Sequence, residues 1–339
     1  MSARSTPSAS GVITAICEQI ACGLPARIRQ AILNLPSEVL MQIEEIRLRL
    51  GRPLQILYGG RDQFVTLQGK VTREPEAGHM LTEEDMAQTL NLMSGSSLYA
   101  LEEELRRGYI TMVGGHRVGI AGRILLDGTG NVRGMKEIAA FNIRIARDVQ
   151  QVADGLGHLL IDSASYRLHN TLLISPPQCG KTTLLRDLAR KISKGTLHPK
   201  IAGQKVSIVD ERSEIAASWR GAPQHDLGPR TDVLDACPKA EGMTMMIRSM
   251  SPQVLITDEI GRSEDGHALL EAIHAGVTVI TTAHGFGMHE VRSRPLLRQL
   301  FELGAFTRYL VLSRRHGPCT VEGVYDKRGD LIQTGAEVG

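Results

Sequence analysis

An eight-residue loop between an apolar run and a helical pattern constrains the fold of this chain most. The loop and the residue after it are Ser175, Pro176, Pro177, Gln178, Cys179, Gly180, Lys181, Thr182 and Thr183. A strand, then this loop, then a helix is the context of a phosphate-binding loop. Its backbone N–H groups point at phosphate oxygens, and the helix N-terminus adds a positive dipole end. The sequence therefore predicts a nucleotide site here, although Ser175 stands where such loops usually begin with Gly.

Two side chains of this loop have predicted roles with ATP and Mg²⁺. Lys181 would reach the β- and γ-phosphates, and the Thr182 hydroxyl would be a ligand of Mg²⁺. About 75 residues later, the apolar run 254–257 ends in Asp258 and Glu259. Ligands bind where the strands of such sheets end. We expect Asp258 to hold Mg²⁺ through water and Glu259 to act as the general base toward the attacking water.

Two further strand ends add candidates to the site. The run 206–209 is followed by Asp210 and Glu211, so Glu211 is the rival to Glu259 for the role of base; we favour Glu259. The run 277–281 leads to His284, which could report on the γ-phosphate or on a neighbouring subunit, or could be structural.

Phosphoryl transfer also needs added positive charge, often from a neighbouring subunit. The candidates in the predicted ATPase domain are Arg248 and Arg262, together with Arg230. Arg144 and Arg147 lie just before that domain and are further candidates. The sequence does not choose among these five, and each could equally be a surface ion-pair partner.

The pattern of apolar runs predicts an α/β fold for the second half of the chain. Strands are expected at Leu172–Ser175, Val206–Val209, Val254–Thr257, Val277–Thr281 and Tyr309–Leu312, with helical segments between them. Continuous apolar strands that alternate with helices form a mostly parallel sheet covered on both faces. We expect a RecA-like P-loop ATPase domain with a sheet of five or more strands over residues 170–335.

A smaller α+β domain is predicted before it, over residues 11–150. A helical pattern covers 12–41, short strands follow from Glu45 to Leu67, and a helix capped by Thr82 comes next, with Asp85 three residues after the cap. Hairpin strands over 109–126 and a strand over 141–146 complete it. Residues 1–10 are expected to be a disordered tail, and residues 151–169 a linker that leads into the ATPase domain.

The composition limits the function classes. The 339 residues carry 39 basic and 37 acidic side chains and only 4% aromatic residues. A nucleic-acid motor would need basic loops and stacking aromatics, so we regard it as the weaker alternative. The five cysteines form no C-x-x-C pair, which fits a reducing, cytoplasmic compartment. A slow nucleotide-dependent assembly switch is the third alternative, although the complete set of catalytic residues favours turnover.

Part of the predicted ATPase domain resembles the ring ATPases of type II and type IV secretion and pilus assembly. The resemblance runs from Asp258-Glu259-Ile260-Gly261-Arg262 through an alanine-rich helix to Thr282-Ala283-His284 and covers residues 170–290. It implies assembly into a ring, with six subunits expected.

A second resemblance covers nearly the whole chain. The segments 114–119, 175–183, 209–214, 230–235 and 246–252 are similar to the stage III sporulation protein AA family. This resemblance implies an ATPase that powers a channel between mother cell and forespore in endospore-forming bacteria. It also implies a location in the mother-cell cytoplasm, peripheral to the membrane, with membrane-embedded proteins of the channel as partners.

Overall fold

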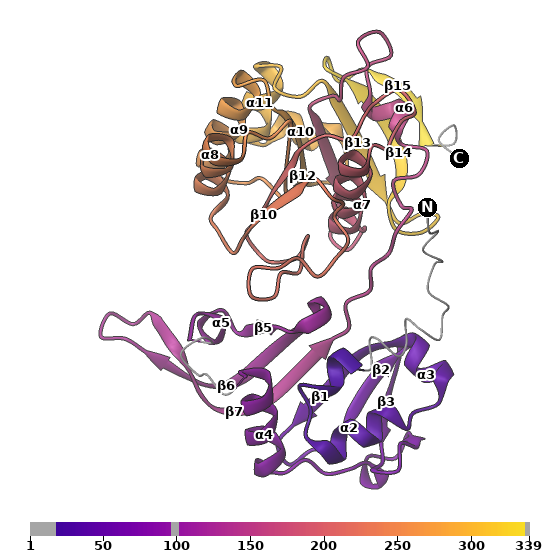
Figure 1. Cartoon of the computed structure of the whole chain (residues 1–339), viewed down its shortest axis with the longest axis vertical. Coiled ribbons are helices and arrows are strands. Elements are labelled where there is room, and N and C mark those ends of the chain that lie inside the picture. The colour runs from indigo at the N-terminus through magenta and orange to yellow at the C-terminus, as the bar shows by residue number, and fades with distance from the viewer. Residues whose placement is uncertain (1–17, 96–101, 336–339) are drawn as a thin grey trace. The chain divides into compact units, whose positions relative to one another are not determined.

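The chain forms two compact units, and the boundary between them along the sequence lies between Arg147 and Asp148. The structure, a computed structural model, describes residues 18–95 and 102–335, so the predicted tail over 1–10 lies outside the described residues. Each unit has its own sheet and its own hydrophobic core (Figure 1). In the described part of the chain, no helix has the length and apolar character needed to cross a bilayer.

The first unit is built on a seven-stranded antiparallel sheet with the order β4-β3-β2-β1-β7-β6-β5. Its strands are β1 (Ile43–Arg49), β2 (Gln55–Tyr58), β3 (Arg61–Val65), β4 (Val71–Thr72), β5 (Tyr109–Thr111), β6 (Arg117–Leu126) and β7 (Val132–Arg144). Its helices are α2 (Ala26–Leu33), α3 (Ser37–Gln42), α4 (Glu83–Met93) and α5 (Glu102–Arg107). Apolar side chains of the sheet and the helices share one core, because alternate residues of each strand face the helices.

The start of α4 shows the predicted cap. Thr82 accepts a hydrogen bond from the backbone N–H of Asp85 at 3.3 Å, and the Asp85 carboxylate accepts one from the N–H of Thr82 at 2.9 Å. Arg27 donates a further hydrogen bond to Asp85 at 2.7 Å and so joins α2 to α4. These charged and polar contacts hold the pKa of the buried Asp85 below its ordinary value, although burial alone would raise it.

The second unit is built on an eight-stranded sheet with the order β10-β9-β11-β12-β8-β13-β14-β15. The strands are β8 (Thr171–Ser175), β9 (Val206–Asp210), β10 (Thr231–Asp235), β11 (Val254–Thr257), β12 (Thr278–His284), β13 (Arg308–Ser313), β14 (Thr320–Asp326) and β15 (Leu331–Thr334). The strands from β10 to β13 in this order are parallel, and β14 and β15 are antiparallel additions at one edge. All five predicted strands are present, and three further strands, β10, β14 and β15, enlarge the sheet.

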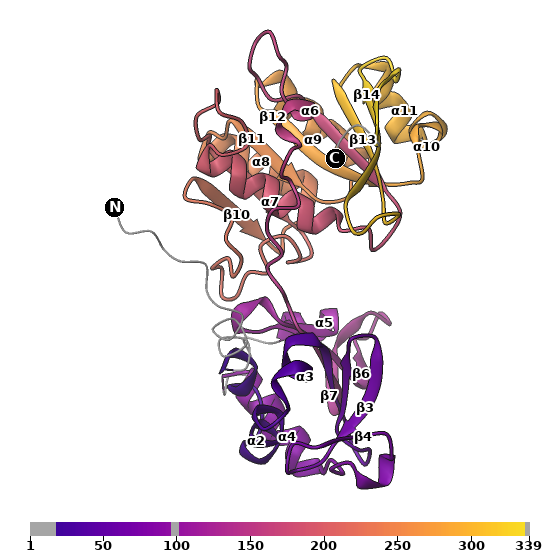
Figure 2. The ribbon, with the colours of Figure 1, turned by 90° about the vertical axis from the view of Figure 1, so that its right-hand side faces the viewer.

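Helices cover both faces of this sheet, as its apolar strands require. They are α6 (Gly157–Leu160), α7 (Lys181–Lys194), α8 (Lys239–Met250), α9 (Ser263–His274), α10 (Met288–Ser293) and α11 (Pro295–Glu302). The apolar side of α7 packs with α6 against one face, and α8, α9, α10 and α11 share a second core with the other face (Figures 1 and 2). A β-α-β arrangement of this kind places all six parallel carboxyl ends at one edge of the sheet.

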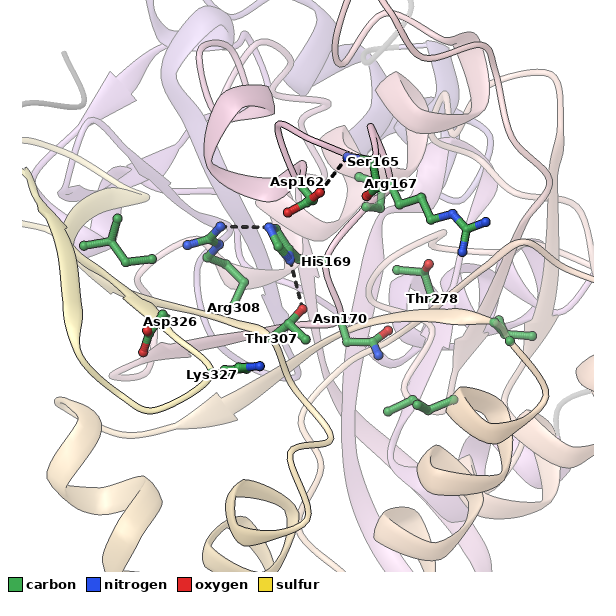
Figure 3. Close-up of a pocket in the computed structure, with 15 residues that line it drawn as sticks. Asp162, Ser165, Arg167, His169, Asn170, Thr278, Thr307, Arg308, Asp326 and Lys327 are labelled. Atoms are coloured by element: carbon green, nitrogen blue, oxygen red, sulfur yellow. Dashed lines mark hydrogen bonds between the residues drawn. The ribbon is translucent and has the colours of Figure 1, made fainter.

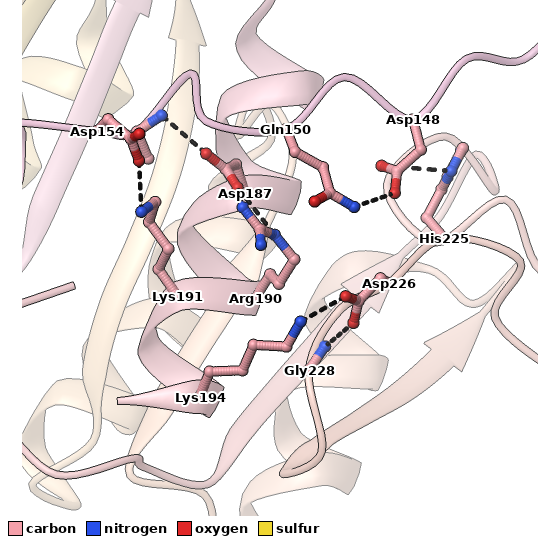
Figure 4. Close-up of polar contacts among 11 residues, drawn as sticks. Asp148, Gln150, Asp154, Asp187, Arg190, Lys191, Lys194, His225, Asp226 and Gly228 are labelled. Carbon is pink, nitrogen blue, oxygen red and sulfur yellow. Dashed lines mark hydrogen bonds and ion pairs between the residues drawn. The ribbon is translucent and has the colours of Figure 1, made fainter. Parts of the chain in front are cut away.

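The residues that lead into the second unit are fixed to α7. The Asp187 carboxylate of α7 accepts a hydrogen bond from the backbone N–H of Ala153 at 2.9 Å, and Lys191 forms an ion pair with Asp154 at 2.5 Å (Figure 4). Further along, Leu156, Leu159, Leu160 and Ile161 are buried in the core of the second unit. Residues 153–161 are therefore packed into that unit.

Candidate nucleotide-binding site

The loop predicted to bind phosphate, called the phosphate-binding loop below, lies between β8 and α7, which is the strand–loop–helix context that the sequence predicts. Ser175 ends β8 and is buried, and Gly180 is the N-cap of α7 with a φ of 87°. Glycine adopts this left-handed conformation without steric cost. Pro177 and Gln178 are exposed at the tip of the loop. Lys181, Thr182 and Thr183 form the first turn of α7, so the backbone N–H groups of this turn point toward the loop.

Lys181 is folded back onto its own loop. Its Nζ donates hydrogen bonds to the carbonyl oxygens of Ser175, at 3.0 Å, and of Pro176, at 3.3 Å. Burial lowers the pKa of Lys181, and the negative charge of the nearby Glu259 opposes this effect. The ammonium group therefore lies in the loop and within the electrostatic reach of the acidic end of β11.

The turn between β13 and β14 closes the other side of the loop. The backbone N–H of Cys319 donates to the carbonyl oxygen of Cys179 at 2.8 Å, and the Cys319 thiol donates to that of Gly180 at 3.2 Å. A Cβ atom at Gly180 would lie 2.6 Å from the Cys319 sulfur. Burial raises the pKa of Cys319 to about 11, so the thiol is neutral. Its contact with the loop is packing and hydrogen bonding.

Two buried aspartates mark the carboxyl ends of β9 and β11. Asp210 accepts hydrogen bonds from the backbone N–H groups of Glu214, Ile215 and Ala216 at 2.8–3.0 Å, so its carboxylate shapes the loop that follows β9. Asp258 follows β11 directly, and burial raises its pKa to about 6. Residues 257 and 209 are register partners, which brings both strand ends to the edge where the phosphate-binding loop lies.

Lys239, the first residue of α8, lies between Glu211 and Asp258. Its Nζ donates a hydrogen bond to Glu211 Oε2 at 2.5 Å and lies 2.9 Å from Asp258 Oδ1. Burial lowers the pKa of Lys239, but the two carboxylates outweigh burial and leave the pKa above its ordinary value. Glu259, in contrast, is exposed and forms no hydrogen bond or ion pair with any residue in the described ranges. The two candidate bases therefore have different surroundings.

His284 ends β12 beside the phosphate-binding loop, because it is the register partner of Ser175. Its ring contacts that of Phe286 edge-on, with 6.2 Å between the ring centroids. Thr281 of the same strand donates to the carbonyl oxygen of Asp258 at 2.9 Å and so fixes the end of β11. The structure therefore brings His284 and the Asp258 backbone to the same edge as Lys181.

The candidate arginines lie in different places. Arg230 donates to the carbonyl oxygen of Ser193 at 2.8 Å, near the far end of α7, and so supports the fold there. Arg262 is exposed at the N-terminus of α9, four residues after Asp258, and Arg248 is exposed in the last turn of α8. In the first unit, Arg147 donates to the carbonyl oxygen of Ile43 at 2.9 Å, and Arg144 is exposed at the end of β7.

The site residues fit a Mg²⁺ ion that arrives with a nucleotide. Within residues 18–95 and 102–335, no group of three His, Cys, Asp or Glu side chains could hold a metal ion alone. Mg²⁺ commonly binds through one or two carboxylates, substrate phosphates and waters. Asp258 Oδ1 is buried and accepts no hydrogen bond within those ranges, since the nearby Lys239 ammonium lies outside hydrogen-bond geometry. A metal-bound water could reach this oxygen only by replacing the Lys239 ammonium, which lies 2.9 Å from it.

A further cavity of the second unit lies away from this site. It has a volume of about 720 Å³ and opens at the amino-terminal ends of β8, β12 and β13, opposite the phosphate-binding loop (Figure 3). Its polar groups are mostly paired: Arg308 bonds His169 at 2.8 Å, His169 bonds Thr307 at 3.0 Å, and Asp162 accepts from the N–H of Ser165 at 2.7 Å. The cavity shares no residue with the nucleotide site.

Sequence reasoning missed Lys239 and Cys319. Lys239 follows β10 by four residues, so a correct prediction of β10 would have placed it at the edge of the sheet with Asp258. The sequence around Cys319 carries no signal for its contact with the loop, because that contact depends on how the β13–β14 turn folds over Gly180.

The chain is similar to known proteins over most of its length. The family model described as "Sporulation stage III, protein AA" matches residues 15–332. Stage III sporulation protein AA of Bacillus subtilis (strain 168) is 49% identical over 314 residues, which span 93% of this chain and 96% of that protein.

Solved structures with the same fold include two ATPases or motors. The Legionella pneumophila ATPase DotB has a TM-score of 0.51 and 15% identity, with 80% of this chain and 72% of that chain covered. The pilus retraction motor PilT with bound ADP has a TM-score of 0.54 and 14% identity, with 92% and 81% covered. At these identities the likeness concerns the fold alone. The family match extends over nearly the whole chain, and the protein therefore belongs to the sporulation stage III protein AA family.

Proposed function

We propose that this protein binds ATP at the loop 175–182 and hydrolyses it with Glu259 as the general base. The observation that carries the proposal is the meeting of Lys181, Asp258 and Glu259 at one edge of the sheet. Lys181 lies in a strand–loop–helix turn with a left-handed glycine before it, and Glu259 is near enough to affect its pKa. Binding of a triphosphate and activation of the attacking water require a lysine and acidic side chains at the same place.

The chain's own residues would bind the nucleotide by exchanging contacts. Lys181 would leave the carbonyl oxygens of Ser175 and Pro176 and donate to phosphate oxygens instead. The amides of the first turn of α7 would donate to the same phosphates, where the helix dipole favours negative charge. Cys319 would keep the conformation of the loop during this exchange, because its N–H and its thiol donate hydrogen bonds to the carbonyl oxygens of Cys179 and Gly180.

Thr182 and Asp258 would hold Mg²⁺ together with the phosphates. The ion, when bound, neutralises charge that develops on the transferred phosphoryl group. Asp258 suits a water-mediated contact because it directly follows β11 at this edge of the sheet, where its Oδ1 would exchange the Lys239 ammonium for a metal-bound water. The hydroxyl of Thr182 belongs to the first turn of α7, one residue after Lys181.

The surroundings of the two candidate bases support Glu259 over Glu211. A general base must accept a proton from water, so its carboxylate has to be accessible and not already bound to a cation. Glu211 accepts a hydrogen bond from the Lys239 ammonium at 2.5 Å, whereas Glu259 is exposed and near the phosphate-binding lysine.

We further propose that the protein works as a ring, with six subunits, that powers a channel between mother cell and forespore. Family membership supports the role in sporulation, and the fold of secretion and motor ATPases supports a motor. The ring would act from the mother-cell cytoplasm on membrane-embedded proteins of the stage III channel. Arg248 and Arg262 are exposed, so either could reach the nucleotide of a neighbouring subunit.

Phosphate release by four proteins tests the catalytic assignment: wild type, Glu259→Gln, Glu211→Gln and the control Glu271→Gln. Glu271 is an exposed residue of α9, remote from the strand ends. We expect Glu259→Gln to bind ATP and assemble, as seen by light scattering, but to lose turnover at least about 100-fold. The control should match wild type. Full turnover by Glu259→Gln together with its loss in Glu211→Gln would reverse the assignment.

A further inference from the structure

Lys239 occupies an unusual position in the nucleotide site. Its side chain is only 7% exposed, and its ammonium group lies between Glu211 at 2.5 Å and Asp258 at 2.9 Å. It reaches this place from the first turn of α8, directly after Pro238, which caps the helix. The sequence motifs of a P-loop ATPase do not include this residue, so its presence needs a separate explanation.

The position is electrostatically unfavourable for a lysine unless the two acids are present. The N-terminus of a helix carries a partial positive charge, so cations are disfavoured there and favoured at the C-terminus. Burial adds a desolvation cost. The carboxylates of Glu211 and Asp258 offset both costs, so the lysine and the two acids depend on each other.

The contacts of Lys239 with the two acids differ in kind. The ammonium is hydrogen-bonded to Glu211, whereas its approach to Asp258 Oδ1 lacks hydrogen-bond geometry. Arg212 also acts electrostatically on Asp258, but it is exposed, and Asp210 is occupied by three backbone N–H groups. Lys239 is thus the buried cation beside Asp258, hydrogen-bonded to Glu211 at 2.5 Å and in an ion pair with Asp258 at 2.9 Å.

We propose that Lys239 is a positioning residue whose ammonium group holds the place of a metal charge beside Asp258 until the Mg²⁺–nucleotide complex binds. On binding, Lys239 keeps its hydrogen bond to Glu211 and gives up its contact with Asp258. This inference rests on the proposed function, because it assumes that the site takes a Mg²⁺–nucleotide complex. It explains how the protein keeps two carboxylates close together in the nucleotide-free state and why Glu211 is withheld from catalysis.

The consequence is a measurable competition between the lysine and the metal. The ammonium and Mg²⁺ both neutralise Asp258, so removal of the lysine should make the metal bind more tightly. The nucleotide-free protein should become less stable at the same time, because the acids then repel each other. A merely structural lysine would change stability without changing the dependence on Mg²⁺.

The test measures binding of a fluorescent ADP analogue (mant-ADP) as a function of Mg²⁺ concentration, together with the melting temperature in EDTA. The variants are Lys239→Met, Lys239→Arg and the control Lys194→Met. Lys194 pairs with Asp226 at the far end of α7 and is remote from the acids. In Lys239→Met we expect half-maximal binding at a Mg²⁺ concentration lower by on the order of tenfold. Lys239→Arg and the control should resemble wild type.

The outcomes separate this inference from the proposed function. An unchanged Mg²⁺ requirement in a folded Lys239→Met that binds mant-ADP would overturn the role of Lys239 and leave nucleotide binding intact. No binding of mant-ADP by wild type at any Mg²⁺ concentration would overturn both.

If Lys239→Met does not fold, Glu211→Gln gives the answer. Loss of that partner leaves the ammonium to Asp258 alone, so the Mg²⁺ requirement should rise severalfold. An unchanged requirement there would equally refute the competition.

Discussion

Substitution of Asp258 by Asn should stabilise the second unit at neutral pH in the absence of metal. Burial raises the pKa of Asp258 from its ordinary 3.8 to about 6, so the folded state binds a proton that the unfolded state releases. At ~1.4 kcal/mol per pKa unit, ionisation of this carboxyl costs the folded state about 3 kcal/mol at pH 7.5. Asparagine avoids this cost, and Glu211 still accepts the hydrogen bond of the buried Lys239. A gain of this size raises the melting temperature by about 6–12 °C.

The pH dependence distinguishes this reasoning from a general packing effect. The cost is absent below the unfolded pKa, grows as pH rises, and is complete above about pH 6. The gain from Asp258→Asn should therefore fall to roughly half of its neutral-pH value at pH 5 and to about 1 kcal/mol at pH 4.5. Trp219, the single tryptophan, lies in the second unit, so denaturant titrations followed by its fluorescence in EDTA measure that unit. An equal gain at pH 4.5 and pH 7.5 would refute the argument.

Three further predictions concern the loop, a helix cap and the linker. Gly180→Ala should destabilise the second unit by about 2–4 kcal/mol, because Ala is strained in the left-handed conformation and its Cβ clashes with Cys319. A second substitution, Cys319→Ala, should restore part of this loss in denaturant titrations. If it restores nothing, the clash is excluded as a cause. Thr82→Ala should destabilise the first unit by about 1 kcal/mol, seen by circular dichroism, whereas Thr82→Ser should not. Asp187→Ala should speed hydrogen exchange of the Ala153 amide about tenfold or more. Unchanged exchange would show that the hydrogen bond from Ala153 to Asp187 does not protect this amide.

The parallel core of the second unit could be predicted because its strands are continuous apolar runs. All five predicted strands are present, with ends that differ by a few residues: the run expected at Val277–Thr281 extends over Thr278–His284. Strand β10 was missed because Thr231–Asp235 is polar at three of five positions. It lies at an edge of the sheet, where half-exposed side chains carry no apolar signal. Strands β14 and β15, at the other edge, were missed for a related reason.

The first unit was harder to predict in detail. The turn between β2 and β3 consists of Gly59 and Gly60, because Arg61 and Asp62 already belong to β3. The strand expected at 141–146 begins at Val132, since β7 pairs with β6 along a hairpin whose outer part carries exposed apolar and charged residues in no regular alternation. Pairing between strands, and not burial, determines the length of this hairpin, and a single sequence gives little information about pairing.

The residues of the candidate site could be predicted where a side chain follows a single strand in the sequence. They could not be predicted where a contact joins the ends of different strands. Lys181 and Asp258 each follow their own strand, so the local pattern identifies them. The contact of Lys239 with Glu211 and Asp258 joins the ends of three neighbouring strands. It can be anticipated only after the strand order β10-β9-β11 is known.

The attachment of residues 153 and 154 to α7 has a mechanical consequence. Asp187, which holds Ala153, lies six residues after Lys181 on the same helix, or about 9 Å along its axis. A helix of this length is stiff, so a displacement of residues 153 and 154 would also move the first turn of α7, which carries Lys181 and Thr182. Tension on residues 153 and 154 would thus reach the first turn of α7 through the helix itself.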